Sequence, residues 1–297
     1  MTIQSKVENV NPITPLAGDG VNSQAAIAHN ISQPKTGKKI GIIGGGYVGG
    51  TIASFYRETG AEVKVYDKFK ASDPLEEVLK QDYIFVAVPT NFNGQSIDLS
   101  NMDDAMANAA KSHAHAIIIK STVVPGTTQK YQKQYPHLKI VFNPEFLTEE
   151  TAYQDFKYPD RQIIGFTKES YGVAGEIMDL LPLAPYSKII PSNAAEMVKY
   201  FGNTWFSLKV VFANQMFDLC EALGINYDLV KDGVGADRRI GRSHLDVWHG
   251  GYRGYGGKCL PKDTRALIKF AEDAGIDLKI LKVAEEINKK LTGGVDR

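Results

Sequence analysis

The 297-residue sequence has only two cysteines, Cys220 and Cys259, and it carries no net charge. Two cysteines are too few for a disulfide framework, and a reducing compartment fits them best. Basic and acidic residues number 34 each, so the basic excess typical of duplex-binding proteins is missing. The sequence also lacks an apolar run of the roughly 20 residues that span a bilayer, and it lacks a visible secretory signal. We therefore predict a soluble cytoplasmic protein with no nucleic-acid partner, no membrane partner and no metal site.

What the sequence does contain is an alternation of apolar strands and helices. Residues 1–37 are rich in small and polar residues without periodicity and are predicted to be a flexible tail. Strands are predicted at residues 39–43, 63–66, 83–88, 116–119, 139–142 and 163–166, with helices at 49–59, 75–80, 102–112 and near residue 128. This pattern predicts the α/β class, with a Rossmann-type doubly wound parallel sheet over residues 38–190.

From residue 191 onward the apolar spacing becomes helical. Asn193 and Glu196 predict a capping box, and Gly224 predicts the helix end, so one long helix is expected at residues 193–223. It is apolar on several faces, which predicts burial in a core or against a partner subunit, and its length favours a homodimer. With further helices expected at 227–233, 263–275 and 278–291, residues 191–297 are predicted to form an all-helical central domain.

The segment 44–49 has the pattern Gly-x-Gly-x-x-Gly, follows a predicted strand and opens a predicted helix. Gly44 permits the tight turn, Gly46 lets the backbone approach a pyrophosphate, and Gly49 lets helix and strand pack closely. Asp67 ends the next strand, where its carboxylate can bind a ribose and would repel a 2′-phosphate. NAD is therefore predicted over NADP, although the neighbouring Lys68 leaves NADP open. The alternative is a Rossmann-like domain that binds no nucleotide.

Further cofactor contacts are expected in the glycine loop and at the carboxyl ends of the following strands, where ligands bind in open α/β sheets. These residues are Tyr47, Val48, Val88, Pro89, Thr90, Ser121 and Thr122. For Thr90, Ser121 and Thr122, ordinary turn capping explains the hydroxyl groups equally well.

A second glycine-rich segment, residues 254–263, contains Cys259 and runs into a predicted helix. A cysteine near a helix N-terminus with Lys258 and Lys262 close by is expected to have a lowered pKa and to act as a nucleophile. Cys220 lies within the long helix and is expected to be an inert core residue. Two further pairs lie four residues apart, and taken alone each is typical of a solvated face. They are Glu145 with Glu149, and Lys199 with Asn203.

These segments together resemble the nucleotide-sugar dehydrogenases, the family that oxidises UDP-glucose, GDP-mannose and related N-acetyl sugars. The resemblance is carried by Gly-Tyr-Gly-Gly-x-Cys-x-Pro-Lys-Asp at 254–263, Asn-Pro-Glu-Phe-Leu-x-Glu at 143–149, Lys-Ser-Thr-Val-x-Pro-Gly-Thr-Thr at 120–128 and Tyr-Pro-Asp-Arg at 158–161. It runs from about residue 38 to the C-terminus. It implies that a sugar C6 alcohol becomes a carboxylate in two NAD-dependent steps.

The resemblance also implies individual roles. Cys259 would form a thiohemiacetal and then a thioester, Glu149 would activate the hydrolytic water, and Lys199 with Asn203 would stabilise the oxyanion. Asp263, with Thr122, would handle the proton of the first oxidation. Glu149 and Lys262 would also contact the cofactor, and Arg239 would reach the substrate of a neighbouring subunit. Further substrate contacts are implied for Phe146, Leu147, Tyr255, Gly256 and Gly257.

The sequence also departs from the family pattern. Thr148, Glu150 and Lys258 replace the common Arg, Gly and Ser, and residues 244–249 differ from the usual Phe-Leu-containing loop. We expect the chain to lack the family's C-terminal nucleotide-binding domain. Three hypotheses follow: a nucleotide-sugar 6-dehydrogenase, a two-domain dehydrogenase of a smaller alcohol or hydroxy acid, and a catalytically silent NAD-binding dimer. Loss of the domain argues against tight binding of a nucleotide-sugar. The third hypothesis, a catalytically silent protein, is disfavoured because five residues with implied catalytic roles are all present: Cys259, Glu149, Lys199, Asn203 and Asp263.

Overall fold

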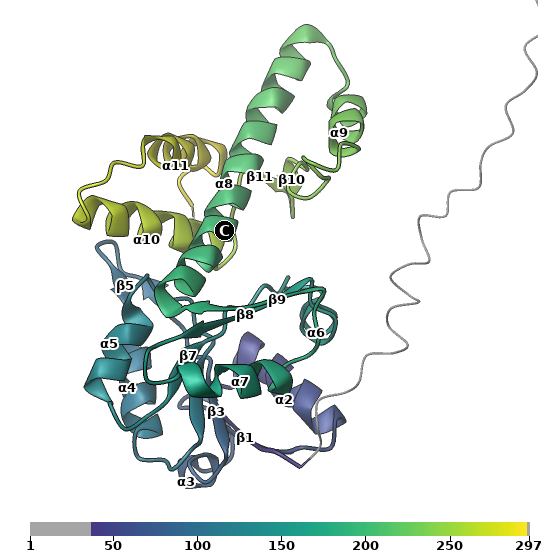
Figure 1. The fold of residues 1–297 in the computed structure, drawn as a ribbon. Coiled ribbons are helices and arrows are strands. Elements are labelled where there is room, and N and C mark those ends of the chain that lie inside the picture. The colour runs from purple at the N-terminus through teal and green to yellow at the C-terminus, as the bar shows by residue number, and fades with distance from the viewer. Residues whose placement is uncertain (1–36, 296–297) are drawn as a thin grey trace, which may run out of the picture. The chain divides into compact units, whose positions relative to one another are not determined.

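A computed structural model describes residues 37–295, so the predicted tail lies almost entirely outside the described residues. The described chain is built on a seven-stranded sheet of order β2-β1-β3-β6-β7-β8-β9 (Figure 1). The strands are β1 (Lys39–Ile43), β2 (Glu62–Tyr66), β3 (Tyr83–Val86), β6 (Ala116–Ile119), β7 (Ile140–Phe142), β8 (Arg161–Phe166) and β9 (Tyr186–Pro191). The first six match the predicted strands, because central strands covered on both faces are apolar at nearly every position.

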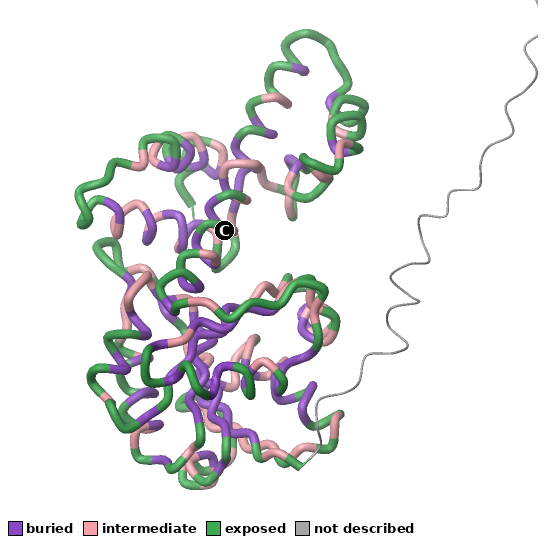
Figure 2. Tube along the Cα trace, viewed as in Figure 1, coloured by how far each residue is buried: buried purple, intermediate pink, exposed green. Residues whose placement is uncertain are grey.

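Helices cover both faces of this sheet, as the doubly wound prediction requires. On one face lie α2 (Tyr47–Glu58), α6 (Ala152–Lys157) and α7 (Ala174–Leu180), and the short 3-10 helix Tyr171–Val173 precedes α7. On the other lie α3 (Leu75–Val78), α4 (Ser100–Ala109), α5 (Thr127–Gln134) and the start of α8 (Ser192–Leu223). A two-stranded ribbon, β4 (Asn91–Phe92) with β5 (Ile97–Asp98), follows β3. The buried residues follow the central strands (Figure 2).

The sheet is mixed, which corrects the prediction of a parallel sheet. Strand β8 pairs antiparallel with β7, through Val141 opposite Phe166 and Phe142 opposite Gly165, and β9 then pairs parallel with β8. A parallel return needs a crossover that spans the length of the strands. The six-residue α6 is about 9 Å long at 1.5 Å per residue, and the chain re-enters the sheet without that crossover. Strand β9, mostly exposed at the sheet edge, was not predicted.

The 32-residue helix α8 confirms the predicted long helix, and Gly224 ends it in the left-handed conformation at φ 67°. It leads to α9 (Tyr227–Gly235), α10 (Leu260–Asp273) and α11 (Lys279–Leu291). This part is not all-helical, since β10 (Trp248–His249) and β11 (Tyr252–Arg253) form a hairpin. Its two loop glycines, Gly250 and Gly251, both have positive φ, which suits the tight twist of a two-residue hairpin turn. The predicted domain boundary at residues 190/191 falls before the last residue of β9, one residue short of the start of α8, and it stays a prediction.

The capping box predicted from Asn193 and Glu196 is wrong. Helix α8 begins at Ser192 with no side-chain cap, and Glu196 is fully buried. Its carboxylate instead accepts hydrogen bonds from the backbone N–H groups of Gly126 (2.6 Å) and Thr128 (2.7 Å) and from the Thr128 hydroxyl (2.6 Å). Glu196 therefore caps the N-terminus of α5 and joins it to α8.

Candidate active site

The glycine loop has the geometry that dinucleotide binding needs. Gly44 has φ +104°, and a Cβ there would lie 2.5 Å from the carbonyl oxygen of Ala87. A Cβ on Gly49 would lie 1.9 Å from the Gly44 carbonyl oxygen, whereas one on Gly46 would meet nothing within 4 Å. The turn and the close helix packing therefore require Gly44 and Gly49. The open space at Gly46 lets a pyrophosphate approach the free N–H groups of the first turn of α2.

Asp67 lies beside this loop at the end of β2. Its Oδ2 accepts a hydrogen bond from the Gly45 N–H (2.8 Å), and its Oδ1 accepts one from the Phe69 N–H (2.9 Å). A small hollow of about 40 Å³ brings Asp67 together with Gly44, Val88 and Pro89. The residues present thus fit the adenosine side of NAD. Lys68, which leaves NADP open in the sequence, forms an ion pair with Asp104 at 3.2 Å.

The hydroxyl residues at the ends of β3 and β6 make backbone contacts. The Thr90 hydroxyl donates to the carbonyl of Thr122 (2.7 Å), and the Ser121 hydroxyl donates to the carbonyl of Val88 (2.7 Å). These bonds join the two strand ends and account for the turn-capping interpretation. Each oxygen can still accept a hydrogen bond from a ligand, so the cofactor contacts stay predictions.

A cavity of about 530 Å³ lies where the carboxyl end of β7 meets helices α8 and α10. Among its lining residues are Cys259, Lys199 and Asn203. Phe146 and Leu147, both expected to contact substrate, line it as well. The structure thus brings together three segments, residues 146–147, 199–203 and 259, that are separated by more than 50 positions in the sequence.

Lys199 forms a buried ion pair in this cavity. Its Nζ lies 2.8 Å from Oε1 of Glu145, and the two side chains are 6% and 10% exposed. Burial by itself would raise the pKa of Glu145, but Lys199, the Leu147 N–H and Lys120 outweigh that effect and hold the pKa below its ordinary value. Glu145 is therefore ionised at neutral pH. Glu149, which the sequence analysis favoured, is exposed and is not among the cavity-lining residues.

Asn203 lies one turn further along α8 and meets the start of α10. Its side-chain amide donates to the Asp263 carboxylate, which also pairs with Lys262. Asp263 is 1% exposed, so these two partners stabilise a carboxylate that would otherwise be buried without compensation. The pairing places the polar face of α8 directly against α10.

Cys259 is the N-cap residue of α10, as the helix start in the sequence predicted. The prediction of a lowered pKa is wrong. Although the residue is exposed at the cavity wall, protein atoms around the thiol desolvate it and raise its pKa. Asp263 and Glu145 add to this increase, and Lys199 and Lys262 oppose it without reversing it. Cys220 is 8% exposed within a small core cluster, as predicted.

Tyr47 links the glycine loop to the cavity. Its hydroxyl donates to the carbonyl of Thr148. Desolvation, followed by the carboxylates of Glu145, Glu149 and Asp155 and by Cys259, raises the pKa of this phenol to about 12. The predicted cofactor loop and the predicted nucleophile therefore face the same region.

Several predicted substrate residues are placed apart from the cavity lining. The Tyr255 side chain is buried, and its hydroxyl donates a hydrogen bond to Glu285 Oε2 (2.6 Å). Its backbone N–H donates to Asn288 Oδ1 (2.7 Å), and its carbonyl accepts from Asn288 Nδ2 (2.9 Å). Gly256 and Gly257 do not line the cavity either. Arg239 is 89% exposed and pairs with Asp237 (2.6 Å), as suits a residue expected to act on a neighbouring subunit.

Several cavity residues were not predicted as site candidates, among them two cations and a histidine. Lys120 is 3% exposed and donates to Asn143 Oδ1 (2.8 Å). Arg161 stacks on the Phe146 ring at 3.9 Å, and His244 enters the lining from the loop after α9. Lys120 and Arg161 belong to motifs that carried the family resemblance and could have been found there.

Among the described residues, no helix is long and apolar enough to cross a membrane. No group of three metal-ligating side chains is present within residues 37–295 either.

Comparison with known proteins follows the two parts of the structure. Residues 66–180 match the NAD binding domain of the UDP-glucose/GDP-mannose dehydrogenase family, and residues 193–290 match its central domain. UDP-glucose 6-dehydrogenase AglM of Haloferax volcanii is 31% identical over 301 residues, covering 84% of this chain and 69% of that protein. The chain belongs to the UDP-glucose/GDP-mannose dehydrogenase family.

Other family members agree. UDP-glucose 6-dehydrogenase of Rickettsia prowazekii is 38% identical over 217 residues, which cover 70% of this chain and 48% of the relative. A solved UDP-glucose dehydrogenase from Pyrobaculum islandicum superposes with a TM-score of 0.76 at 28% identity, covering 87% of this chain and 69% of that one. The chain thus spans between about half and about two thirds of the relatives' length, and it contains the family's NAD-binding domain.

Proposed function

We propose that this protein oxidises the C6 alcohol of a nucleotide-sugar to a carboxylate in two NAD-dependent steps, as UDP-glucose 6-dehydrogenases do. The observation that carries the proposal is the shared cavity. Cys259 at the start of α10 lines the same space as Lys199, Asn203 and Glu145, and the glycine loop lies beside it. Family membership supports the same substrate class.

In the first oxidation the alcohol loses a proton and a hydride and becomes an aldehyde. NAD, when bound, accepts the hydride in each of the two oxidations. Asp263 is buried beside the cavity-lining Asn203 and pairs with Lys262. We assign to Asp263, together with Thr122, the transfer of the alcohol proton. Lys199 and Asn203 hold the substrate oxygen through N–H donors during this step.

The second oxidation uses Cys259 as the nucleophile. The thiol loses its proton, the sulfur bonds to the aldehyde carbon, and the resulting thiohemiacetal oxygen is negatively charged. Because the pKa of the thiol is raised, the thiol gives up its proton only as the sulfur attacks. Cys259 is exposed, so this proton passes to solvent. Lys199 stabilises the oxyanion. Loss of the second hydride leaves a thioester on Cys259, which retains the intermediate in the site.

Water then attacks the thioester, releasing the carboxylate and the Cys259 thiol. We assign activation of this water to Glu145. Glu149, four residues further along the same loop, is exposed and does not line the cavity, so it is less well placed for this role. In sum, one alcohol, two NAD and one water yield one carboxylate, two NADH and three protons.

We also propose that the protein is a homodimer joined through α8. The apolar stripe of that helix, defined by Met197, Phe201, Trp205, Phe212, Leu219 and Leu223, is exposed along its length. Apolar patches of this extent mark interfaces.

The direct test is NADH production with UDP-glucose, UDP-N-acetyl sugars and GDP-mannose. We expect two NADH per sugar for one of them. The Cys259→Ser variant should lose the second oxidation by about 1000-fold or more and still bind NAD. Cys220→Ser is the matched control, because Cys220 lies in the core cluster away from the cavity, and it should keep both steps.

Other results would contradict the proposal. One NADH from a small alcohol would favour the simpler dehydrogenase, and NAD binding without any turnover would favour a silent dimer. Equal loss of both oxidations in Cys259→Ser would contradict the covalent role of the thiol.

The assignment of the hydrolytic base has its own test. Glu145→Gln should accumulate a sugar-acyl adduct on Cys259 after mixing with substrate and NAD, detected by intact-protein mass spectrometry. Glu149→Gln, a matched change in the same loop, should accumulate none. Glu145→Gln also leaves the buried Lys199 without its counter-ion. Breaking a buried ion pair costs about 3–5 kcal/mol of stability, so the folding of this variant must be checked by thermal denaturation. The reverse pattern of adducts would assign the base to Glu149.

A further inference from the structure

The loop between α9 and β10 holds a residue in an unusual backbone conformation. His244 has φ 65°, and it is the one non-glycine with positive φ within residues 37–295. Histidine tolerates this left-handed region better than most residues, but the conformation persists only where the surroundings impose it. Backbone strain of this kind concentrates at ligand sites, so His244 is a candidate ligand contact.

The chain is clamped on both sides of His244. On one side, Lys209 of α8 donates to the carbonyl of Ile240 (3.0 Å) and to the Ser243 hydroxyl (3.4 Å). On the other, the Tyr227 hydroxyl donates to the carbonyl of Leu245 (2.8 Å). These contacts hold the loop against α8 and α9 and fix the position of His244.

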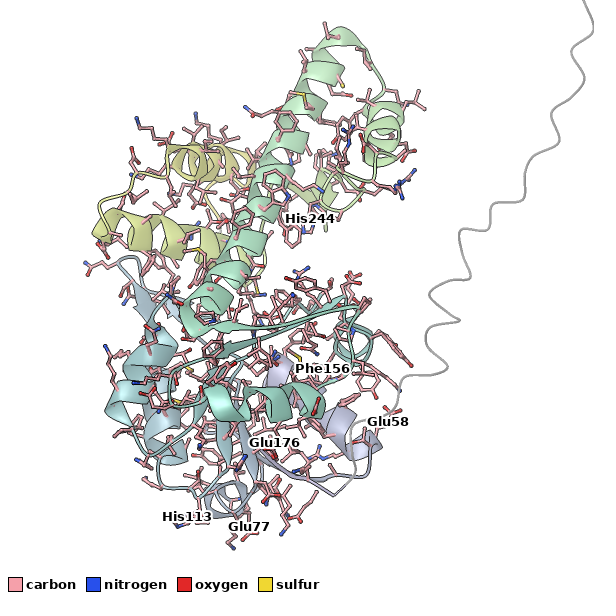
Figure 3. All side chains as sticks on the ribbon, viewed as in Figure 1. Glu58, Glu77, His113, Phe156, Glu176 and His244 are labelled. Carbon is pink, nitrogen blue, oxygen red and sulfur yellow. The ribbon has the colours of Figure 1, made fainter. Side chains whose placement is uncertain are left out.

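The imidazole ring is fixed as well. It stacks on the ring of Phe206 with centroids 4.0 Å apart and an interplanar angle of 1°. Phe206 follows Asn203 by three residues on α8, so the two lie on neighbouring turns of one helix face. Both line the cavity, as do Ser243 and His244. Figure 3 places His244 beside α8, on the side of the helix that the α9–β10 loop approaches.

One ring nitrogen has no partner. His244 Nδ1 is buried, and no group within residues 37–295 forms a hydrogen bond with it. The large majority of buried side-chain polar atoms in proteins are hydrogen-bonded. Burial, and then the positive charge of Lys209 and the nearby His249, lower the pKa of His244. The ring is therefore neutral at pH 7 and suited to a hydrogen bond with a neutral group.

We propose that His244 Nδ1 forms a hydrogen bond with a hydroxyl of the sugar held in the cavity and so helps to set which sugar the site accepts. A hydroxyl both donates and accepts, so it can pair with Nδ1 in either tautomer. The cavity offers the cation Arg161 for an anionic group, and its guanidinium suits a phosphate better than the neutral His244 ring does. This inference rests on the proposed function, whose site it deepens.

Substitutions that mimic one nitrogen or the other test the assignment. His244→Phe removes the polar atom. His244→Asn places a polar atom near the Nδ1 position and tolerates positive φ, whereas His244→Gln places one near Nε2. We expect His244→Phe to raise the KM for the preferred nucleotide-sugar by about 10-fold to 100-fold, with the KM for NAD unchanged. His244→Asn should restore most of the loss, and His244→Gln should not.

Binding measurements separate the sugar from the nucleotide. Isothermal titration calorimetry should show that UDP alone binds wild type and His244→Phe equally. A deoxy-sugar nucleotide that lacks the contacted hydroxyl should bind wild type and His244→Phe equally, because neither complex can form the hydrogen bond to Nδ1. Weaker binding of UDP to His244→Phe would place the contact at the nucleotide or the diphosphate and overturn the assignment.

Two failures are distinguishable. If wild type turns over a nucleotide-sugar and His244→Phe has the same KM, this inference alone is wrong. If wild type neither binds nor oxidises any nucleotide-sugar, the proposed function is wrong and the inference falls with it. A His244→Gly variant, which relieves the backbone conformation and removes the ring, shows whether a loss follows from folding. A purely structural role predicts that KM, kcat and melting temperature change together in all the variants.

Discussion

Lys120 is a buried amine in the cavity wall, and its protonation should affect stability. Burial lowers the pKa of Lys120 to about 7, with Glu145 opposing that effect and Lys199 adding to it. Between pH 7 and 10 the unfolded chain therefore holds a proton at this position that the folded chain has released. Because the unfolded state binds more protons, the free energy of unfolding should rise with pH, by up to about 1.4 kcal/mol per unit.

The measurement is urea unfolding of wild type and Lys120→Met at pH 7, 8 and 9. The wild-type free energy of unfolding should rise more steeply than that of the variant. The slope is the readout, because Lys120→Met also removes the donor to Asn143 Oδ1 and so changes the absolute stability. Lys130→Met, which removes an exposed lysine of α5, should keep the wild-type slope. Parallel slopes for wild type and Lys120→Met would contradict the assignment.

At this scale the sequence identified residue types better than their environments. Cys259, Lys199, Asn203 and Asp263 were each predicted, and the structure brings them together. The pKa of Cys259 was predicted with the wrong sign. The flanking lysines are visible in the sequence, whereas desolvation of the thiol, which is the largest cause, and the approach of Glu145 depend on the fold. The assignment of the hydrolytic base to Glu149 stays a prediction. The ion pair of Glu145 with Lys199, which only the fold reveals, supports Glu145 for that role instead.

At the scale of helices and strands, the apolar pattern predicted each element whose own residues form a buried face. It did not predict features that depend on contacts with other elements. The central strands and α8 were predictable, because their side chains follow strand or helix periodicity. The edge strand β9 lacks a buried face, and its pairing with β8 depends on the reversed direction of that strand. Glu196 shows the same limit. Its spacing from Asn193 fits a capping box, yet the N–H groups it accepts from belong to α5, about 70 residues away in sequence.

At the scale of the whole molecule, the exposed apolar stripe of α8 is the surface through which we propose that the dimer forms. Phe201, Trp205, Phe212 and Leu223 are 67%, 54%, 62% and 63% exposed, and at 3.6 residues per turn they share one side of the helix. A second copy packed on this stripe would form a two-fold interface, the commonest arrangement in homo-oligomers. Arg239, which the family resemblance implies acts on a neighbouring subunit, is also exposed.

We therefore expect the wild-type chain to be a dimer by sedimentation equilibrium, and Trp205→Glu to dissociate it. A buried interface tryptophan of this kind is worth about 2 kcal/mol or more, so the dissociation constant should rise by at least about 30-fold. Glu221→Lys changes a charge on the opposite side of the same helix and should leave the dimer intact. Circular dichroism and NAD binding check that Trp205→Glu remains folded. A monomeric wild type, or a Trp205→Glu variant that associates as tightly as wild type, would show that this stripe is not the dimer interface.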